Sequence, residues 1–369
     1  MDEELNDTPE TLTPSEPTQS ELMYDRFLKT GDVFASNDTT MDDLFREQGF
    51  GSQKSRLTAA LYGFDHESIG THLDYPKEEY GMVFFTKPRL NLSYNNIKHD
   101  RVFAPMQSRS GLSIPRIVKA YLDPVEAIIG KRGSPLVDNN SPFITLLTQS
   151  CTQLSGWPDL YAKTYSSKPG LYGQTGSKPD GPAKFYEAFP ISGTFNPGIS
   201  DIVGDLFHKW VTYSLLVHDG TFSPYLDYII SNRMDFNTRI YVVVLDSTRT
   251  RVKKISCCGA AFPQFTNTGL DANYNREAPS IEAQPIQMQF TAMGVFYRDG
   301  IVAHAFNRTV QDWMPAMHDK YRNSYMVKLR APYKRMMNNL GYPRINPLNS
   351  DWEWWVKKED YDMIIKRGG

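Results

Sequence analysis

Three apolar stretches in the second half of the chain most constrain its fold. Residues Arg239–Asp246 read RIYVVVLD, a nearly continuous β-branched run that predicts a strand buried on both faces. A returning strand is predicted over Arg251–Phe262. Apolar and polar residues alternate within Ser280–Gly300, in the pairs Ile286–Gln287, Met288–Gln289 and Phe290–Thr291. This alternation predicts a long strand with one apolar and one polar face.

Helices are predicted around these strands. Asp201–Val217 carries apolar residues at helical spacing, with Ser200 as the expected cap and Gly220 in the region where the helix stops. Ser113–Asp123 has a proline near its start, as helix entry allows. Ser141–Gly156 is also predicted as a helix, with Cys151 packed inside it. Two shorter helices are expected at Thr40–Gln48 and Ser223–Ile230.

Further strands and loops separate these helices. Gly81–Leu92 predicts a strand in which Pro88 marks an edge, an end or a bulge. Lys184–Phe195 predicts another strand. Residues 166–182 are rich in Gly, Pro, Ser and Lys and predict a linker or an exposed loop, without the strand and helix that a phosphate-binding loop requires. Phe265–Pro279 is polar and is expected to be flexible.

Charge is placed unevenly along the chain. The formal net charge of −2 argues against a dedicated nucleic-acid binder. Residues 1–50 nevertheless hold 13 acidic and 3 basic residues, and residues 318–369 hold 11 basic and 6 acidic residues. These ends either pair with neighbouring chains or remain two solvated tails. Residues 1–23 are expected to be disordered, or ordered by a partner. The WEWW segment at residues 352–355 either packs on its own domain or anchors on another surface.

A search for chemistry leaves no site. Adjacent side chains of a strand point to opposite faces, so Cys257 and Cys258 are expected to be packing residues that do not share a metal ion. His208 and His218 have no second ligand at a useful spacing. Nucleophile elbow and P-loop patterns are absent. We expect no catalytic, cofactor-binding or metal residues and no enzyme activity, although sequence cannot exclude a carboxylate pair formed in space. With no secretory signal and no apolar run of membrane-spanning length, a reducing cytoplasm is the expected compartment.

The segment Arg239–Tyr297 resembles the tail-tube fold of bacteriophages with contractile tails. In that family a strand leads into a motif of the kind "naFP", a polar stretch follows, and a "v.v.f.y" strand comes next. The counterparts here are Ile255–Pro263, Gln264–Pro279 and Ile286–Tyr297. The resemblance covers roughly residues 190–305.

The resemblance implies an α+β, β-rich chain with a tail-tube-like β-sandwich or barrel domain and one flanking helix, plus a mixed N-terminal region and an extended C-terminal tail. It further implies a homo-oligomer, a hexameric ring in or next to the tail tube and baseplate hub, with DNA passing close by and other virion proteins as partners. The expected location is the virion, assembled in the host cytoplasm. The alternatives are a tail-associated cell-wall-degrading enzyme and a neck or adaptor virion protein.

Four regions follow from this interpretation. Residues 1–45 form an acidic arm, and residues 46–183 form a mixed α/β region that ends in the Gly/Pro/Ser/Lys-rich loop. Residues 184–310 form the tail-tube-like domain, and residues 311–369 form a basic, Trp-rich extension.

Overall fold

The structure, a computed structural model, describes residues 79–129, 133–159, 164–180, 187–198, 200–266, 285–298, 300–329 and 340–368. The chain divides into two compact units, Met1–Lys77 and Glu78–Gly369, and all described residues belong to the second unit. The predicted arm at residues 1–45, the helix Thr40–Gln48 and the predicted loop Phe265–Pro279 from residue 267 onward lie outside the described residues.

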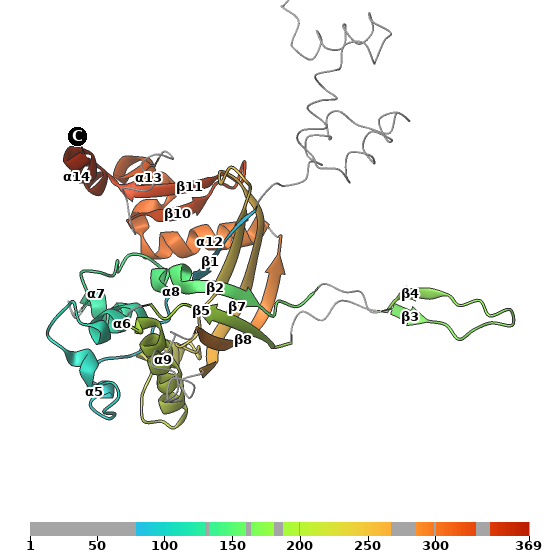
Figure 1. Cartoon of the computed structure of the whole chain (residues 1–369), viewed down its shortest axis with the longest axis horizontal. Helices are drawn as coiled ribbons and strands as arrows, with labels where there is room; N and C mark the ends of the chain where they lie inside the picture. Colours follow the sequence, from blue (N-terminus) through green and yellow to red (C-terminus); the bar gives the residue numbers. More distant parts are fainter. Residues whose placement is uncertain are drawn as a thin grey trace, which may run out of the picture. The chain divides into compact units, whose positions relative to one another are not determined.

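A six-stranded antiparallel sheet is the centre of the described unit (Figure 1). Its strand order is β1 (Tyr80–Phe85), β6 (Ile240–Leu245), β7 (Val252–Thr266), β8 (Ile286–Tyr297), β5 (Phe189–Phe195) and β2 (Cys151–Ser155). The strands predicted from the apolar patterns are therefore confirmed. Strand β1 ends at Phe85, before Pro88, because proline cannot continue the ladder.

Strands β7 and β8 carry the predicted alternation. Ile286, Met288 and Phe290 are buried, whereas the intervening side chains are exposed or half-buried. The alternation is interrupted at Gly294, which has φ of +67° and pairs opposite Gly259 in the ladder register. A side chain at position 294 would be strained in this backbone conformation, so the glycine lets two long strands stay paired through the irregularity.

Helix α9 (Ile202–His218) is the flanking helix of the sheet. Leu206, Trp210 and Tyr213 are fully buried, and Phe207 lies 5.9 Å from Phe290 of β8 between ring centroids. The predicted cap is wrong by one residue: Asp201, with φ of +46°, occupies the N-cap position in place of Ser200. Gly220 follows the helix with φ of +75°, as the predicted stop requires.

The remaining elements of the first half pack with α9 or connect it to the sheet. They are α5 (Tyr94–Ile97), η1 (Ala104–Gln107), α6 (Ile114–Leu122), α7 (Pro124–Ile129), α8 (Thr145–Ser150) and α10 (Leu226–Ile230). Helix α6 confirms the prediction for Ser113–Asp123, with Ser113 at its N-cap position. Residues 164–179 form a separate hairpin of β3 (Thr164–Ser166) and β4 (Ser177–Pro179), whose connecting residues are the predicted exposed loop.

The predicted helix over Ser141–Gly156 is wrong. Helix α8 covers Thr145–Ser150, and the chain then becomes edge strand β2, which begins at Cys151. Thr152 and Gln153 are polar and suit an exposed edge, and the Thr152 hydroxyl donates to the Thr194 carbonyl at 3.0 Å. Pairing with β5 therefore decides the conformation of a stretch whose apolar spacing also fits a helix.

The C-terminal region folds back onto the sheet. Helix α12 (Gly300–Trp313) leads through η2 (Pro315–Met317) and α13 (Asp319–Tyr325) to a three-stranded sheet, and α14 (Lys358–Gly368) ends the chain. The strand order of this small sheet is β10 (Tyr342–Ile345), β11 (Trp352–Lys357) and β9 (Met326–Lys328). Trp352 and Trp355 are buried in it, so the WEWW segment packs on its own chain.

Two aromatic-rich cores meet the sheet. One joins β5, the lower part of β8 and α9, and the other surrounds Phe306 of α12. Phe306 lies 5.4 Å from Phe84, 5.2 Å from Phe143 and 5.3 Å from Tyr241 between ring centroids. Each such aromatic pair adds about 0.5–1.5 kcal/mol beyond area burial. Helices α8 and α9 pack on one face of the sheet and α12 packs on the other, because the neighbouring residues Phe85 and Phe84 of β1 contact Phe290 and Phe306 respectively.

A buried carboxylate ties the helical layer together. Asp123, at the end of α6, is fully buried and accepts hydrogen bonds from the Leu92 and Glu126 amides at 2.8 and 2.9 Å. It also accepts from the Tyr225 hydroxyl, which lies 2.9 and 3.0 Å from its two oxygens. Burial raises the Asp123 pKa to about 6, although these hydrogen bonds and Lys119 oppose that shift.

Asp123 predicts a pH dependence of stability. Because its pKa is raised in the folded state, its protonated form adds stability below the unfolded pKa, and this is lost as pH rises through about 6. Between pH 4 and 7 we expect the free energy of unfolding to fall by about 2 kcal/mol relative to Asp123→Asn. Urea titrations at several pH values measure this difference. The exposed Asp227→Asn is the control and should keep the wild-type slope; parallel curves for Asp123→Asn and wild type would contradict the assignment.

Candidate functional site

The two edges of the six-stranded sheet are the first candidate assembly surface. Strands β1 and β2 end the strand order, and no other described strand pairs with their outer sides. The lower end of β1 is partly covered, because the Ile144 amide donates to the Phe85 carbonyl at 2.8 Å. Strand β2 carries a register shift between Cys151 and Gln153. Unpaired edges are templates for pairing with another chain, so this sheet has two places where another copy can add a strand.

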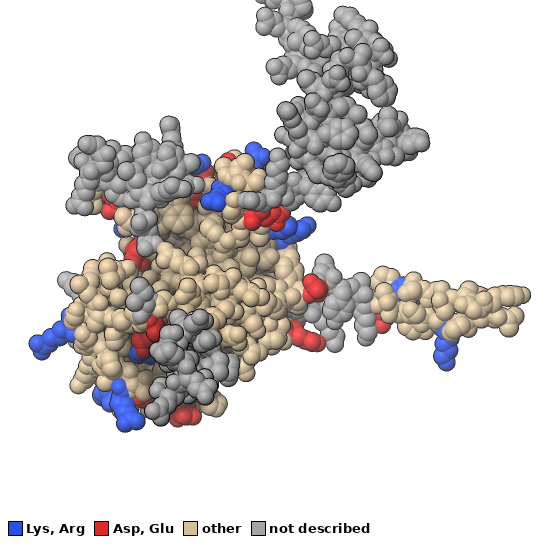
Figure 2. All heavy atoms as spheres, viewed as in Figure 1, with Lys and Arg blue, Asp and Glu red and all other residues tan. Residues whose placement is uncertain are grey.

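The part of one sheet face that β5, β8 and the end of β7 form is polar but uncharged. Ser192 pairs with Gln289 and Thr194 pairs with Gln287 across β5 and β8. On the adjacent strand β7, Gln264 accepts a hydrogen bond from the Thr291 hydroxyl at 2.6 Å. These side chains alternate with the buried row of β8 and thus face away from the core. In the view of Figure 2, charged residues lie around the margins of the described body, whereas its centre carries almost none.

Lys253 and Lys254 mark the upper end of β7, where a solvated strand edge is predicted. Both ammonium groups approach Glu79, at 3.4 and 3.1 Å, and all three side chains are substantially exposed. Exposed pairs of this kind contribute little stability. Their effect is to place charge at the strand end, next to β1.

The three cysteines are free thiols. Cys257 and Cys258 are both buried, and they belong to different hydrophobic clusters. Burial raises the Cys257 pKa to about 12 and the Cys258 pKa to about 11. The Ile240 amide donates to the Cys258 sulfur at 3.2 Å. The expectation of two packing residues in separate environments agrees with this arrangement. Cys151 is half-buried and lies on β2, not in a helix.

Neither a metal-ligand cluster nor a membrane-spanning helix is found among the described residues. No group of three or more His, Cys, Asp or Glu side chains there could hold a metal ion. His208 and His218 lie on α9. No helix in the described part of the chain is both long and apolar enough for a transmembrane span.

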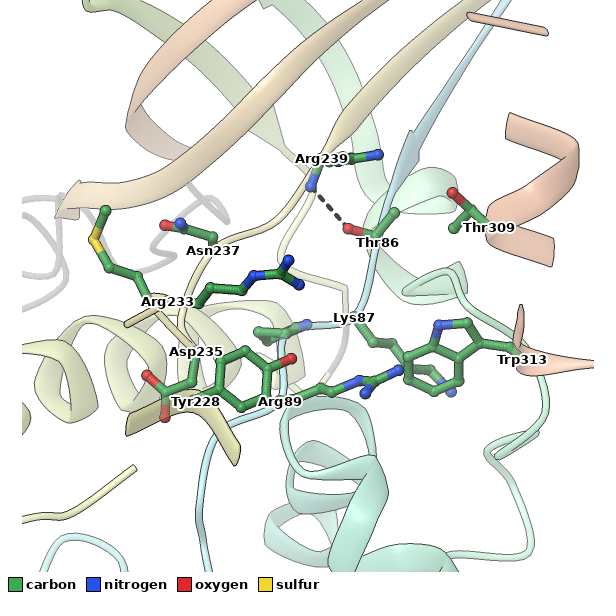
Figure 3. A pocket seen from close by; sticks show the side chains of 12 residues that line it. Thr86, Lys87, Arg89, Tyr228, Arg233, Asp235, Asn237, Arg239, Thr309 and Trp313 are labelled. Atoms are coloured by element: carbon green, nitrogen blue, oxygen red, sulfur yellow. Dashed lines mark hydrogen bonds between the residues drawn. The ribbon is translucent and has the colours of Figure 1, made fainter. Parts of the chain in front are cut away.

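A basic pocket of about 310 Å³ lies beside the lower end of β1 (Figure 3). It is formed where β1 ends, where the segment after α10 leads into β6, and where α12 ends. Its charged and aromatic lining residues are Lys87, Arg89, Arg233, Asp235, Arg239, Tyr228 and Trp313. Lys87 is buried, donates to the Asp138 carbonyl at 2.7 Å and lies 5.6 Å from the Trp313 ring centroid. Burial lowers the Lys87 pKa to about 8.

A second hollow, of about 400 Å³, lies along α12. It is lined by His304, Arg308, Asp312, His318, Asp319 and Arg344, among others. Hydrogen bonds from Arg322, then the nearby Arg322 and Arg344 charges, lower the Asp319 pKa. Asp319 is thus held as an ionised ion-pair partner, whereas a general acid needs a raised pKa. This hollow therefore offers no acid prepared for glycoside cleavage at Asp319.

Sequence reasoning does not find the basic pocket. Its residues come from three segments more than 60 positions apart, and no motif links them. The available signal was the pair Lys87 and Arg89 on either side of Pro88, which is too short to be specific. The uncharged sheet face, by contrast, follows directly from the Gln287, Gln289 and Thr291 alternation.

The family model described as "Putative phage tail tube protein" matches residues 28–369. The chain therefore belongs to this family of phage tail tube proteins and is a structural tail component. The α+β, β-rich fold with a flanking helix that the resemblance implied is confirmed. No curated protein matches the chain.

Solved structures of injection-system tubes are distantly similar. The cryo-EM structure of the anti-feeding prophage cap, a tube-terminating cap, is 18% identical over 40% of this chain and 79% of the cap, with a TM-score of 0.25. The sheath/tube terminator of the PVC extracellular contractile injection system is 12% identical over 40% and 85%, with a TM-score of 0.23. The sheath–tube complex of the same system is 14% identical over 43% of this chain and 83% of the matched chain, with a TM-score of 0.25. The family assignment rests on the family model alone.

The buried thiols predict slow labelling. Because the pKa values of Cys257 and Cys258 lie well above 8 and both side chains are buried, iodoacetamide at pH 8 should modify them only through unfolding. The half-buried Cys151 should react first. Peptide mass spectrometry gives the three rates, with guanidinium-unfolded protein as the control in which all three react alike. Cys257→Ala with Cys258→Ser should leave assembly largely intact; rapid labelling, bound metal or lost redox activity would contradict the packing role.

Proposed function

We propose that copies of this chain join through the edges of the six-stranded sheet into a closed ring, a hexamer, that forms part of a DNA-ejection channel. The observation that carries the proposal is an antiparallel sheet with β1 and β2 open at its two edges. When β1 of one copy pairs with β2 of the next, each copy covers one edge of each neighbour. Cyclic closure then removes every open edge without open-ended growth around the ring.

The uncharged face gives this ring a surface suited to DNA. A wall of Lys and Arg would bind phosphates and hold the duplex, whereas Ser, Thr and Gln side chains carry no charge that must be released as DNA moves. Ser192, Thr194, Gln287 and Gln289 form such a surface across β5 and β8. We infer that this surface lines the channel, while α9 and the helices packed with it face outward.

The ring is placed in or next to the tail tube and baseplate hub of a contractile tail, with assembly in the host cytoplasm and contacts to other tail proteins. The support is the size of the chain: α5–α8 and the whole C-terminal sheet are additions around the strands β5–β8 that resemble a tube domain. The four-region division made from the sequence stays a prediction. The sheet itself takes β1 and β2 from before residue 184 and four strands from after it.

Engineered disulfides test the ring. In a Cys151→Ser background, Gly81→Cys on β1 and Gln153→Cys on β2 place a thiol at each edge, and both positions are exposed. A Cβ at position 81 meets nothing within 4 Å. Ring closure should give a ladder of covalent oligomers that ends at the closed ring on oxidation, seen by denaturing electrophoresis without reductant.

A small scan of cysteine positions on β1 and β2 identifies the strand register between copies. Met82→Cys and Thr152→Cys shift the pair by one residue, and one combination should crosslink best because cross-strand Cβ atoms must lie about 3.5–4.5 Å apart. Each single cysteine variant is the matched control and should give at most a dimer. Absence of crosslinks in every combination, together with a persistent monomer or trimer in negative-stain images, would refute edge-to-edge closure.

Charge on the sheet face tests the channel. Gln287→Arg with Gln289→Arg should leave folding and ring formation intact, because both side chains face away from the core. DNA ejection from particles carrying the variant should slow at low salt and recover at high salt, since counterion release weakens with salt. Fluorescent dye uptake during triggered ejection measures the rate. Gln287→Glu with Gln289→Glu is the control of opposite charge, and equal slowing by both pairs would contradict the electrostatic explanation.

A further inference from the structure

The basic pocket beside β1 has four cations and one carboxylate, Asp235, among its lining residues, and the charge of Asp138 also acts on Lys87. None of Lys87, Arg89, Arg233 and Arg239 makes an ion pair with another described residue. Asp235 also lines the pocket, but it is 2% exposed and its carboxylate accepts a hydrogen bond from the Tyr213 hydroxyl. In Figure 3 its carboxylate points away from the guanidinium group of Arg233.

The basic C-terminal region differs from this pocket. Arg344 pairs with Glu353 at 2.8 Å, Lys328 pairs with Glu353 at 2.9 Å, and Arg322 pairs with Asp319. These cations are neutralised within their own fold. The sequence suggests the C-terminal region as the counterpart of an acidic arm, whereas in the described residues four cations without an ion pair line the basic pocket.

One of the pocket cations is also largely removed from water. Lys87 is 5% exposed, and its ammonium group is held by one backbone carbonyl between the rings of Tyr121 and Trp313, 5.6 Å from each centroid. The charge of Asp138 offsets part of the cost of this desolvated cation, while the three exposed arginines add further positive charge beside it. The pocket therefore has a net positive charge that suits an additional negatively charged group.

An exposed apolar ridge adjoins the pocket. Helix α10 buries none of its residues, and Leu226, Ile229 and Ile230 are 67%, 54% and 75% exposed. Met234, 46% exposed, continues the ridge and lines the pocket together with Tyr228. Apolar side chains gathered next to a cationic hollow are typical of a protein-binding surface, because they match a partner that carries acids beside apolar residues.

We propose that the pocket and the α10 ridge bind the acidic N-terminal segment, residues 1–50, of a second copy of this chain. The segment has 13 acidic and 3 basic residues, which complements the four cations. Its acids stand beside apolar residues: Asp25 follows Leu22–Tyr24, and Asp42 and Asp43 precede Leu44 and Phe45. A carboxylate enters the pocket while these apolar residues cover α10. The inference rests on the proposed self-assembly, to which it adds a second contact between neighbours.

Photocrosslinking tests the contact in the full chain. Benzoylphenylalanine is placed at Met234, and ¹⁴N- and ¹⁵N-labelled copies are mixed before irradiation under assembly conditions. Mass spectrometry should find mixed-isotope pairs that join position 234 to residues 20–50. Pairs of a single isotope composition only, or crosslinks only to other segments, overturn the proposal.

A charge exchange gives the sharper test. Arg89→Glu with Arg233→Glu should lower the yield of mixed-isotope pairs about tenfold, and so should Asp42→Lys with Asp43→Lys, because each places like charges together. The two pairs combined should restore the yield. Lys168→Glu with Lys178→Glu, on the β3–β4 hairpin, is the matched control and should leave it unchanged. Failure of the combined variant to recover overturns the pairing.

Further variants and imaging distinguish a loss of folding from a loss of the proposed contact. If Arg89→Glu lowers the melting temperature through its contact with Trp313, 5.3 Å from the ring centroid, Arg233→Glu alone replaces the double variant, since this position is exposed. Negative-stain imaging of the same samples reports ring formation. Rings without the crosslink refute this inference and leave the proposed function intact, whereas crosslinked pairs that never form rings support the contact and refute the ring.

Discussion

The long pairing of β7 with β8 is the interaction on which the rest of the structure depends. These are the longest strands of the sheet, and they stay in one register from Ser256–Tyr297 to Pro263–Phe290. Strand β6 extends this pair on one side and β5 on the other. Both aromatic cores rest on it, because Phe290 packs with α9 while Cys257 and Ile255 join the cluster around Phe306. Loss of this ladder would remove the surface on which both helical layers pack.

The two aromatic cores hold the helices against the sheet. Aromatic residues supply most of the contact area: Phe84, Phe143, Phe306 and Trp352 lie within 6.0 Å of one another in successive ring pairs. Burying such a side chain contributes about 1.5–3 kcal/mol. The α9 core contains Ile286, Met288 and Phe290 of β8, whereas the α12 core lies on the opposite face of β1, β6 and β7. The Gln and Thr row of β8 points away from the α9 core and stays exposed or half-buried. The same alternation thus stabilises the subunit and leaves an uncharged wall.

The charged residues of this chain are grouped in regions that differ in sign and in pairing. The net charge of −2 is the sum of an acidic N-terminal segment, a C-terminal region in which Arg322, Lys328 and Arg344 form ion pairs, and a pocket whose cations form none with described residues. One subunit can carry both the neutral surface of β5 and β8 and charged margins, because the charged residues lie near the ends of strands and helices. Electrostatic contacts at the margins can therefore form without placing charge on the Gln and Thr row of β8.

The sequence by itself determined the strands and the main helix. Period-two alternation over Ile286–Thr291 and the apolar stripe of Asp201–Val217 are local patterns, and each one identifies both the element and its buried face. The separation of Cys257 from Cys258 followed from the same geometry. Local pattern failed at Ser141–Gly156, where edge pairing with β5 overrode helical spacing, and helix α12 was not predicted. Only the tertiary structure decided the strand order, the open edges and the basic pocket, because contacts between Lys87, Arg233 and Trp313 join residues whose distance in sequence gives no signal.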